Sequence, residues 1–410
     1  MTDTAALWRE LVAENTLQQR LLEVQGALSW DQQTQMPPEA GPARGEQMSL
    51  LMRLSHERIT SARYAELLDA LAERPDLDPV QQAGLRNVAR GWRRAVRVPA
   101  DLVARSGRLQ GEGYDAWMRA RAANDWTVLR PVLAEIVEVA RARADAIDAT
   151  RPAYDVTLEE YDPGATAAAI APLFARLEAG LAVLLDAIRG AEPLPALEGR
   201  WDVARQAALS RAVAEALGYD FARGRLDVAA HPFTVPLGAT DVRITTRFDA
   251  DDLLAGLGST IHETGHALYE QGLPAELYGT GVAAAASTGV HESQSRFWEN
   301  TIGRSLPFCR WLQGPLREHL GDGAPEARAL YLAANRVAPG LVRVEADEVT
   351  YNLHVLVRFE LERALFAGEL AVDDLRDAWN EAYVRTLGLA PPDDASGVLQ
   401  DIHWASGAFG

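Results

Sequence analysis

Hydrophobic residues recur along most of the chain at intervals of three and four residues, which is the spacing of an amphipathic helix. In the segment 44–59, four such residues fall near one face: Met48, Leu51, Met52 and Leu54. The segment 372–388 opens with acidic side chains and ends at Gly388, as helices do at their two ends. These patterns predict a mainly helical protein.

The segment 165–188 is a longer apolar-rich stretch that is interrupted by Arg176 and Glu178. No run of the chain reaches the roughly 18 uninterrupted apolar residues that indicate a membrane-spanning helix. We therefore expect this segment to form a largely buried helix of a globular protein.

One stretch has a different period. In DVRITTRF, residues 241–248, Val242 and Ile244 alternate with polar neighbours, which predicts a β-strand. Asp249 follows as a candidate helix N-cap, with Asp252 three residues on, so the strand should lead directly into a helix. The free edge of such a strand could hydrogen-bond a peptide backbone as an added strand. We expect a small sheet on a mainly helical body.

Proline and glycine are concentrated at three short places, 36–42, 191–199 and 389–394. Each is too short to be a linker between domains, so these places predict turns. We therefore expect one domain over residues 1–410.

Composition narrows the class of protein. The chain has 410 residues, of which 48% are hydrophobic and 24% are charged, as in ordinary soluble globular proteins. Its formal net charge of −18 argues against nucleic acid or an anionic membrane as a partner, because both require basic surfaces. The N-terminal residues lack the apolar segment of a secretory signal, and a single cysteine, Cys309, excludes an internal disulfide. We expect a cytoplasmic protein in which Cys309 packs rather than catalyses.

The motif HETGH at residues 262–266 carries the candidate chemistry. On a helix, His262 and His266 lie one turn apart and point the same way, so their neutral imidazoles can bind one Zn²⁺. Glu263 beside the first histidine can take a proton from bound water. The alternative is an amphipathic helix whose histidines face solvent or the core and whose glutamate is a solvated surface carboxylate.

A catalytic zinc needs a third protein ligand and an open position. The segment HESQ supplies Glu292, 26 residues after His266 (292 − 266), and the turn-rich chain between them suits a reversal. The adjacent His291 is an alternative ligand, but it would turn off the same helical face by roughly 100°. Glu292 is therefore preferred, with an ordinary salt bridge as its alternative role. A closed structural zinc site is disfavoured because it requires four Cys or His ligands.

Five motifs, in this order, resemble those of the M32 family of metallocarboxypeptidases, the carboxypeptidase Taq type: DVRIT (241–245), HETGH (262–266), HESQ (291–294), VRVEAD (342–347) and GVLQDIHW (397–404). HPF (231–233) and SWDQQTQMPP (29–38) extend the resemblance over the whole chain. It implies a mainly helical, two-lobed body with a deep groove and a small sheet next to the HExxH helix, as in neurolysin-like zincins. It also implies a zinc exopeptidase that releases single residues from peptide C-termini with broad specificity.

The resemblance assigns roles to particular residues. The family's zinc ligands correspond to His262, His266 and Glu292, and its general base corresponds to Glu263. It makes His403 a candidate for stabilising the oxyanion, with a packed histidine beside Trp404 as the alternative. It further implies one Zn²⁺ per chain, for which Co²⁺ or Mn²⁺ could substitute, and a homodimer.

An exopeptidase must recognise a free carboxylate, which calls for a fixed cation. Arg343 is the first candidate, with a structural salt bridge to Asp347 or Glu345 as its alternative role. Arg243 is the second candidate, although it could instead pair with Asp241 or another acid. His231 is a candidate for contacting substrate or for stabilising a turn.

Two other functions remain open. Family members usually continue well past HWASGAFG through a tyrosine-containing segment and further helices, so a short form that binds zinc with weak or no turnover is one alternative. The other is a zinc oligopeptidase that cleaves internal bonds with the same chemistry and without a carboxylate anchor.

Overall fold

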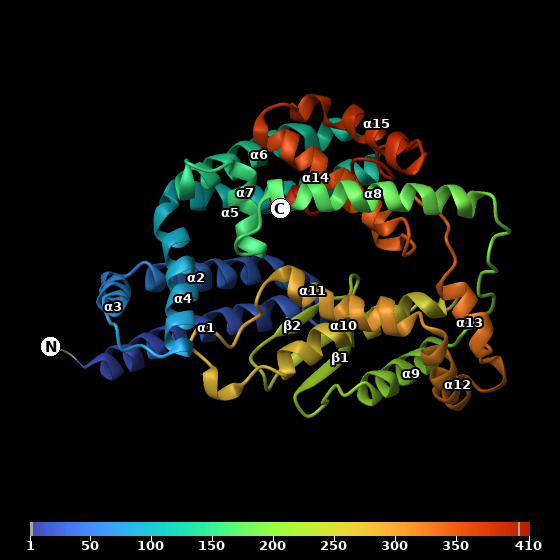
Figure 1. The fold of residues 1–410 in the computed structure, drawn as a ribbon, viewed down its shortest axis with the longest axis horizontal. Helices are drawn as coiled ribbons and strands as arrows, with labels where there is room; N and C mark the ends of the chain where they lie inside the picture. The colour runs from blue at the N-terminus through green and yellow to red at the C-terminus, as the bar shows by residue number, and fades with distance from the viewer. Residues whose placement is uncertain (1–2, 401) are drawn as a thin grey trace. The chain divides into compact units, whose positions relative to one another are not determined.

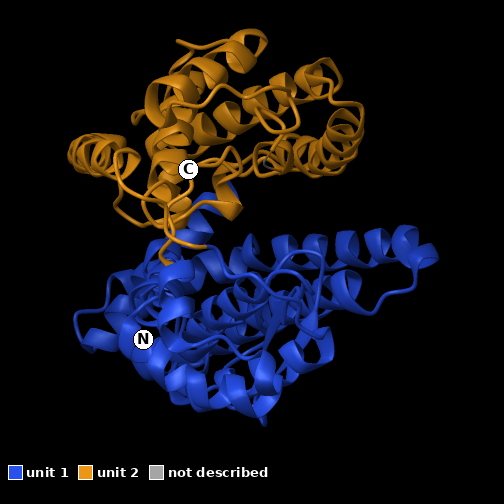
Figure 2. Cartoon of the chain, turned by 90° about the vertical axis from the view of Figure 1, so that its right-hand side faces the viewer, with its two compact units in different colours: residues 1–96, 196–334 blue, residues 97–195, 335–410 orange. Residues whose placement is uncertain are grey.

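The computed structural model describes residues 3–400 and 402–410. Fifteen α-helices and three β-strands lie in this part of the chain, which confirms the mainly helical class with a small sheet. The chain divides into two compact units, each built from two segments (Figure 2): unit 1 is Met1–Val96 with Ala196–Ala334, and unit 2 is Arg97–Pro195 with Asn335–Gly410. The expectation of one domain over residues 1–410 stays a prediction.

Unit 1 contains nine of the described α-helices: α1 (Thr4–Thr34), α2 (Gly41–Ile59), α3 (Ala62–Ala72), α4 (Pro79–Arg97), α9 (Val203–Ala216), α10 (Leu253–Gln271), α11 (Thr288–Arg296), α12 (Leu306–Leu320) and α13 (Ala327–Ala334). One core joins α1, α3 and α4, and a second joins α9, α10, α12 and α13. The predicted helix over 44–59 lies in α2, although Met52 and Leu54 on its apolar face are exposed.

The sheet of unit 1 has three strands: β1 (Gly224–Val228), β2 (Thr234–Pro236) and β3 (Val242–Thr246). Their order is β1-β3-β2, with β1 parallel and β2 antiparallel to β3. Val242 and Ile244 are fully buried in a core that also contains Ala267 of α10, so the sheet is fixed against that helix (Figure 1).

The strand predicted in DVRITTRF is confirmed, but its expected free edge is wrong. It is the central strand β3, and both of its edges are paired within the sheet. The sequence pattern identifies a strand without showing its neighbours: β2 has three residues and β1 mixes charged with apolar positions. The edge strand β2 contacts α10.

Unit 2 contains six of the described α-helices: α5 (Ala100–Ala123), α6 (Trp126–Asp148), α7 (Ala153–Tyr161), α8 (Ala167–Arg189), α14 (Tyr351–Ala367) and α15 (Leu375–Leu387). Side chains from all six pack into one core. The predicted helix over 372–388 is confirmed by α15, which ends where Gly388 takes a left-handed conformation with φ of 72°. Short helical turns complete the two units: η1 (Pro38–Ala40), η2 (Ala275–Leu277), η4 (Gly321–Gly323), η5 (Arg343–Glu345), η6 (Val372–Asp374) and η7 (Trp404–Ser406).

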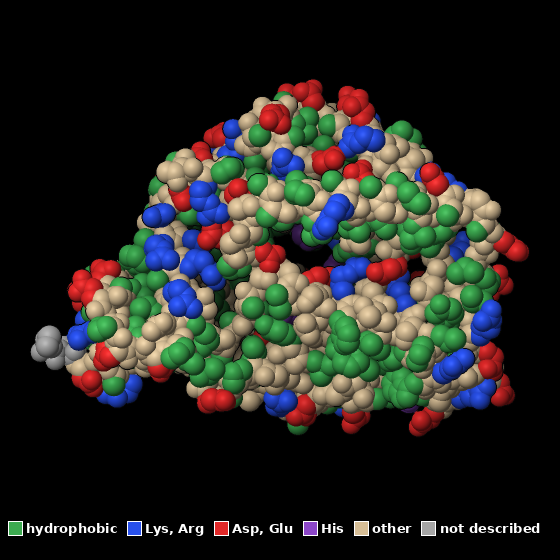
Figure 3. Space-filling model, in the orientation of Figure 1, with side chains coloured by type: hydrophobic (Ala, Val, Ile, Leu, Met, Phe, Trp, Pro, Cys, Tyr) green, Lys and Arg blue, Asp and Glu red, His purple; other side chains and the backbone are tan. Residues whose placement is uncertain are grey.

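The helix predicted over 165–188 is present as α8, but the expected burial is wrong. Among its residues only Leu185 is buried, and Val183 is 73% exposed. Hydrophobic side chains are visible along this helix in Figure 3. By length and composition alone, α8 is the one helix in the described part of the chain that could cross a membrane, a test that core helices also pass. Because α8 is apolar on nearly every side, its pattern could not show which side is covered.

Candidate metal centre

The two histidines of the HETGH motif project from one face of α10. The N-cap of this helix is Asp252, whose side chain accepts a hydrogen bond from the Ala255 amide at 3.0 Å. The expected N-cap, Asp249, is three residues too early; it instead caps a local turn by accepting from the Asp251 amide at 2.9 Å. The shift leaves the histidine spacing on the helix unchanged.

Gly265 allows the next helix to approach α10 closely. A Cβ at this position would lie 2.6 Å from the Cα of Ser295 and 2.7 Å from the carbonyl oxygen of Gln294, both on α11. Such distances are shorter than any real contact of this kind, so only glycine fits without displacing backbone. The close approach brings Glu292 of α11 over the two histidines.

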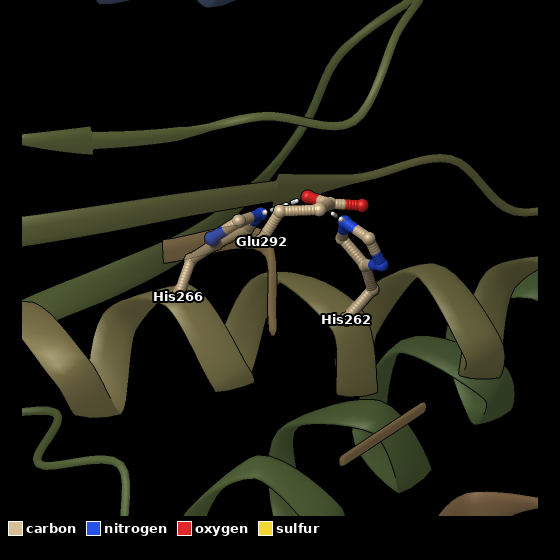
Figure 4. Close-up of side chains that lie close together, drawn as sticks. All are labelled: His262, His266 and Glu292. Atoms are coloured by element: carbon tan, nitrogen blue, oxygen red, sulfur yellow. Dashed lines mark ion pairs between the residues drawn. The ribbon is translucent and has the colours of Figure 1, made fainter. Parts of the chain in front are cut away.

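The three side chains selected from the sequence converge (Figure 4). The Glu292 Oε2 atom lies 3.6 Å from Nε2 of His262 and 3.3 Å from Nε2 of His266. All three ligand atoms lie within 4.8 Å of one another. Ligand atoms of a tetrahedral zinc with bonds of about 2.1 Å are separated by roughly 3.4 Å. The donor set and its spacing therefore fit one divalent metal ion.

The alternative ligand, His291, is engaged elsewhere. Its Nε2 lies 2.8 Å from Oε1 of Glu270, and its ring stacks on His266 with centroids 4.5 Å apart and planes at 18°. His291 is thus a neighbour that packs against the pair rather than a member of the converging set. This placement favours Glu292 as the third ligand.

Charges around the pair shift two pKa values in opposite directions. Burial alone would raise the pKa of Glu292, but the hydrogen bond with His266 and the charge of His262 outweigh it, so the pKa is lowered. Burial alone would lower the pKa of His262, but Glu299 and the other carboxylates outweigh it, so the pKa is raised. The site concentrates negative charge around two imidazoles, which favours a cation between them.

Glu263 is a buried carboxylate, only 6% exposed, which excludes the solvated surface role. Its Oε2 accepts a hydrogen bond from the Thr234 hydroxyl of β2 at 2.6 Å. Burial raises the pKa of Glu263, and the charge of His262 and the Thr234 hydrogen bond oppose this only in part. A carboxylate with a raised pKa is a better proton acceptor near neutral pH.

Two residues beside the converging side chains, Thr234 and Glu299, were not predicted from the sequence. Thr234 lies in a three-residue strand that has no recognisable period. Glu299 lies in a π-helical segment, η3 (Phe297–Gly303), that continues α11, and its Oε2 is 2.8 Å from Nδ1 of His262. The one available signal was its position seven residues after Glu292 (299 − 292), which returns to the same face of a helix.

Two other candidates from unit 1 lie in defined surroundings. Arg243 is bound by both carboxylate oxygens of Asp241, at 2.9 and 2.7 Å, and its guanidinium lies 4.5 Å from the ring centroid of Trp30. This matches the structural pairing that was its alternative role. His231 is exposed, and its Nδ1 donates to the carbonyl of Pro232 at 2.7 Å. Substrate contact by either residue stays a prediction.

The candidates Arg343 and His403 belong to unit 2. The Arg343 amide donates to Oε1 of Gln400 at 2.9 Å, and its guanidinium donates to the Tyr351 hydroxyl at 3.0 Å. His403 is exposed, whereas Trp404 is buried and donates its indole N–H to Glu362 at 2.6 Å. The exposure of His403 does not favour the packed alternative. The proposed roles of both residues stay predictions.

Comparisons with known proteins point in one direction. The family model of carboxypeptidase Taq (M32) metallopeptidases matches residues 11–410. Thermostable carboxypeptidase 1 of Thermus thermophilus is 44% identical over an alignment of 406 residues, and the match covers 94% of this chain and 79% of that protein. The crystal structure of the M32 carboxypeptidase from Deinococcus radiodurans superposes with a TM-score of 0.95 at 41% identity, covering 99% of this chain and 82% of that one. Trypanosoma cruzi metallocarboxypeptidase 1 matches with a TM-score of 0.92 at 33% identity, covering 98% and 83%.

Proposed function

Because the chain belongs to the carboxypeptidase Taq (M32) family of metallopeptidases and is thus a metallocarboxypeptidase, we propose that it releases single residues from peptide C-termini by means of one divalent ion held by His262, His266 and Glu292. The observation that carries this proposal is the convergence of the three ligand atoms, with Glu263 beside them. We propose zinc as the metal, since two imidazoles and one carboxylate form a common catalytic zinc site. Co²⁺ or Mn²⁺ would accept the same ligands.

Proton transfer is the task we propose for Glu263. When bound, the ion supplies Lewis acidity, which lowers the pKa of water and polarises a peptide carbonyl. Glu263 accepts a proton from the attacking water and returns it to the departing amine. Thr234 holds Oε2 of this carboxylate at 2.6 Å, so Oε1 is left for the proton.

Recognition of the substrate carboxylate is the task we propose for Arg343. Its backbone is fixed by Gln400 and its guanidinium by Tyr351, which supports a pre-oriented cation. Arg243 is the weaker candidate because Asp241 already occupies its fork. We propose His403 as an oxyanion donor and His231 as a substrate contact, supported by the exposure of both residues.

A peptide digest followed by mass spectrometry tests the activity. We expect products that differ by one residue from the C-terminus, and we expect amidation of that terminus to block release. Cleavage of the amidated peptide at internal bonds would support the oligopeptidase alternative. Bound metal without turnover by the unmodified chain would support the weakly active form.

A Glu263→Gln variant tests the proton acceptor. Because the amide cannot take a proton, we expect it to keep one metal ion per chain and to lose at least about 100-fold in turnover. Turnover close to that of the unmodified chain would refute the role of Glu263.

We also propose a cytoplasmic homodimer that binds neither nucleic acid nor membranes. The single cysteine supports a reducing compartment, and the net charge of −18 supports the absence of polyanionic partners. The resemblance in sequence motifs supports the dimer. Light scattering should then give a mass of about 89 kDa, twice the 44.6 kDa of one chain.

A further inference from the structure

We propose that Glu299 is a positioning residue of the metal site, which holds the His262 ring from the side away from the ligand atoms and thereby raises the affinity for a divalent ion. The inference rests on the proposed function, since it takes His262 as a metal ligand. Its basis is the arrangement of two carboxylates around one imidazole.

The two nitrogens of His262 face different carboxylates. Nδ1 lies 2.8 Å from Oε2 of Glu299, and Nε2 lies 3.6 Å from Oε2 of Glu292. A neutral imidazole carries its proton on one nitrogen and a lone pair on the other. A carboxylate that accepts the proton of Nδ1 selects the tautomer whose Nε2 has the free lone pair, which is the form that binds a metal.

One continuous helical segment supplies both carboxylates. Glu292 lies in α11, and Glu299 lies seven residues later in the π-helical segment η3 that follows directly. π-Helical turns are rare and are often found at functional sites. Both side chains reach His262: Glu292 lies near Nε2, and Glu299 lies near Nδ1 on the other side of the ring.

Glu299 is held in place by a second partner. Its Oε1 lies 3.5 Å from the Arg304 guanidinium, while Oε2 is taken by His262. The side chain is only 24% exposed, so most of the carboxylate is shielded from water. Removing a charge from water is unfavourable unless it is paired, and here each oxygen has its own partner. The carboxylate is therefore fixed rather than mobile.

The second histidine is held differently, and this supplies a control. None of the described residues hydrogen-bonds Nδ1 of His266, whose ring is instead stacked on His291. His291 in turn is hydrogen-bonded to Glu270 at 2.8 Å. The carboxylates of Glu299 and Glu270 thus make histidine hydrogen bonds of equal length, and of these two only that of Glu299 acts on a proposed metal ligand.

The experiment compares three variants of the full chain: Glu299→Ala, Glu299→Gln and Glu270→Gln. Zn²⁺ affinity is measured by competition with a chromophoric chelator, and the Co²⁺-loaded forms are compared by visible absorption. We expect Glu299→Ala to bind Zn²⁺ about 10- to 100-fold more weakly and to change the Co²⁺ spectrum. Glu299→Gln should lose less, because its amide oxygen can still accept the hydrogen bond without charge. Glu270→Gln should stay within about threefold of the unmodified chain.

Thermal unfolding of the metal-free forms separates positioning from folding. Glu299→Gln keeps the shape of the side chain, so without metal we expect it to have the same melting temperature as the unmodified chain. Added Zn²⁺ should raise the melting temperature of this variant less than that of the unmodified chain. Unchanged Zn²⁺ affinity in Glu299→Ala, or equal weakening in Glu270→Gln, would overturn the proposal. A His262→Ala variant distinguishes failure of this inference from failure of the proposed metal site. If His262→Ala also binds Zn²⁺ normally, His262 is not a metal ligand, and both the proposed site and the role of Glu299 are wrong.

Discussion

At the residue scale, two reactive groups of the candidate centre, Glu263 and His262, each have a hydrogen-bond partner that restricts their motion. Thr234 holds Glu263, and Glu299 holds His262. Thr234 comes from the short strand β2, and Glu299 comes from the π-helical segment η3. Both residues are far in sequence from the groups that they hold. The sequence motif therefore supplies the chemistry, while the surrounding fold sets the orientation in which it can act.

A Thr234→Val variant tests this view of the general base. Valine keeps the shape of threonine but cannot donate, so a buried carboxylate oxygen loses its partner at a cost of about 1–3 kcal/mol. We expect kcat to fall about 10- to 100-fold while KM and metal content change little. Thr234→Ser, which restores the hydroxyl, should recover most of the rate. Equal kcat for the valine variant and the unmodified enzyme would contradict the role.

His354 predicts a pH dependence of stability. Its side chain is fully buried beside Tyr383, and burial together with the charge of Arg343 lowers its pKa from 6.5 to about 4. The unfolded chain binds this proton at a higher pH than the folded chain does. Stability from the neutral form is therefore complete above pH 6.5 and is lost as the pH falls toward 4, by about 3 kcal/mol.

Urea unfolding at pH values between 4.5 and 7 measures this effect. We expect the unfolding free energy of a His354→Gln variant to depend less steeply on pH than that of the unmodified chain, because glutamine does not titrate. Carboxylates titrate in both proteins, so their contribution to the pH dependence of the unfolding free energy cancels in this comparison. Parallel curves for the two proteins would show that folding does not lower the pKa of His354.

At the scale of elements, helices were predictable and their surroundings were not. The helical period and end signals located α15 and the histidine-bearing α10, but the N-cap is Asp252 rather than Asp249, since either aspartate suits that position. β2 has too few residues to show a period, so its pairing with β3 could not be predicted from the sequence. α8 is apolar on most sides, so the sequence could not show which of its residues are buried. At the site, the spacing of the motifs predicted the three converging side chains, His262, His266 and Glu292. The position of Glu299 could not be predicted without knowing that its segment is π-helical.

The contact between α10 and α11 predicts the effect of a single methyl group. In Gly265→Ala the added Cβ would meet the α11 backbone at 2.6 Å, so the helices must separate and carry Glu292 away from the histidines. We expect a loss of about 1–3 kcal/mol in stability together with weaker metal binding, measured by thermal unfolding and chelator competition.

Gly258→Ala on the same helix is the matched control. There the added Cβ would approach only a carboxylate oxygen of Glu299, at 3.8 Å, which is an ordinary contact. Alanine favours the helix over glycine by up to about 1 kcal/mol, so this variant should be as stable as the unmodified chain or more so. If both alanine variants behaved alike, the tight helix contact would not explain the need for Gly265.

At the scale of the molecule, the two units have separate hydrophobic cores, and the proposed ligands all belong to unit 1. Cys309, the single cysteine of the chain, is fully buried in the core that α10 shares with α12. Burial raises its pKa to about 11. At pH 8 only about one thiol in a thousand would be ionised, so labelling requires unit 1 to open.

Metal binding should therefore slow the labelling of Cys309 in unit 1 more than it slows hydrogen exchange of buried amides in unit 2. A ligand that binds only the folded form stabilises it by RT ln(1 + [L]/Kd), which is about 2.7 kcal/mol at 100 times Kd. Because His262 follows Ile261 of the core around Cys309, zinc should lower the labelling rate by about 100-fold under these conditions. Hydrogen exchange of buried α14 amides, such as that of Val357, reports unit 2 and should slow much less. Equal slowing of both would show that the two units unfold as one cooperative body, and labelling unaffected by zinc would show that the metal does not bind unit 1.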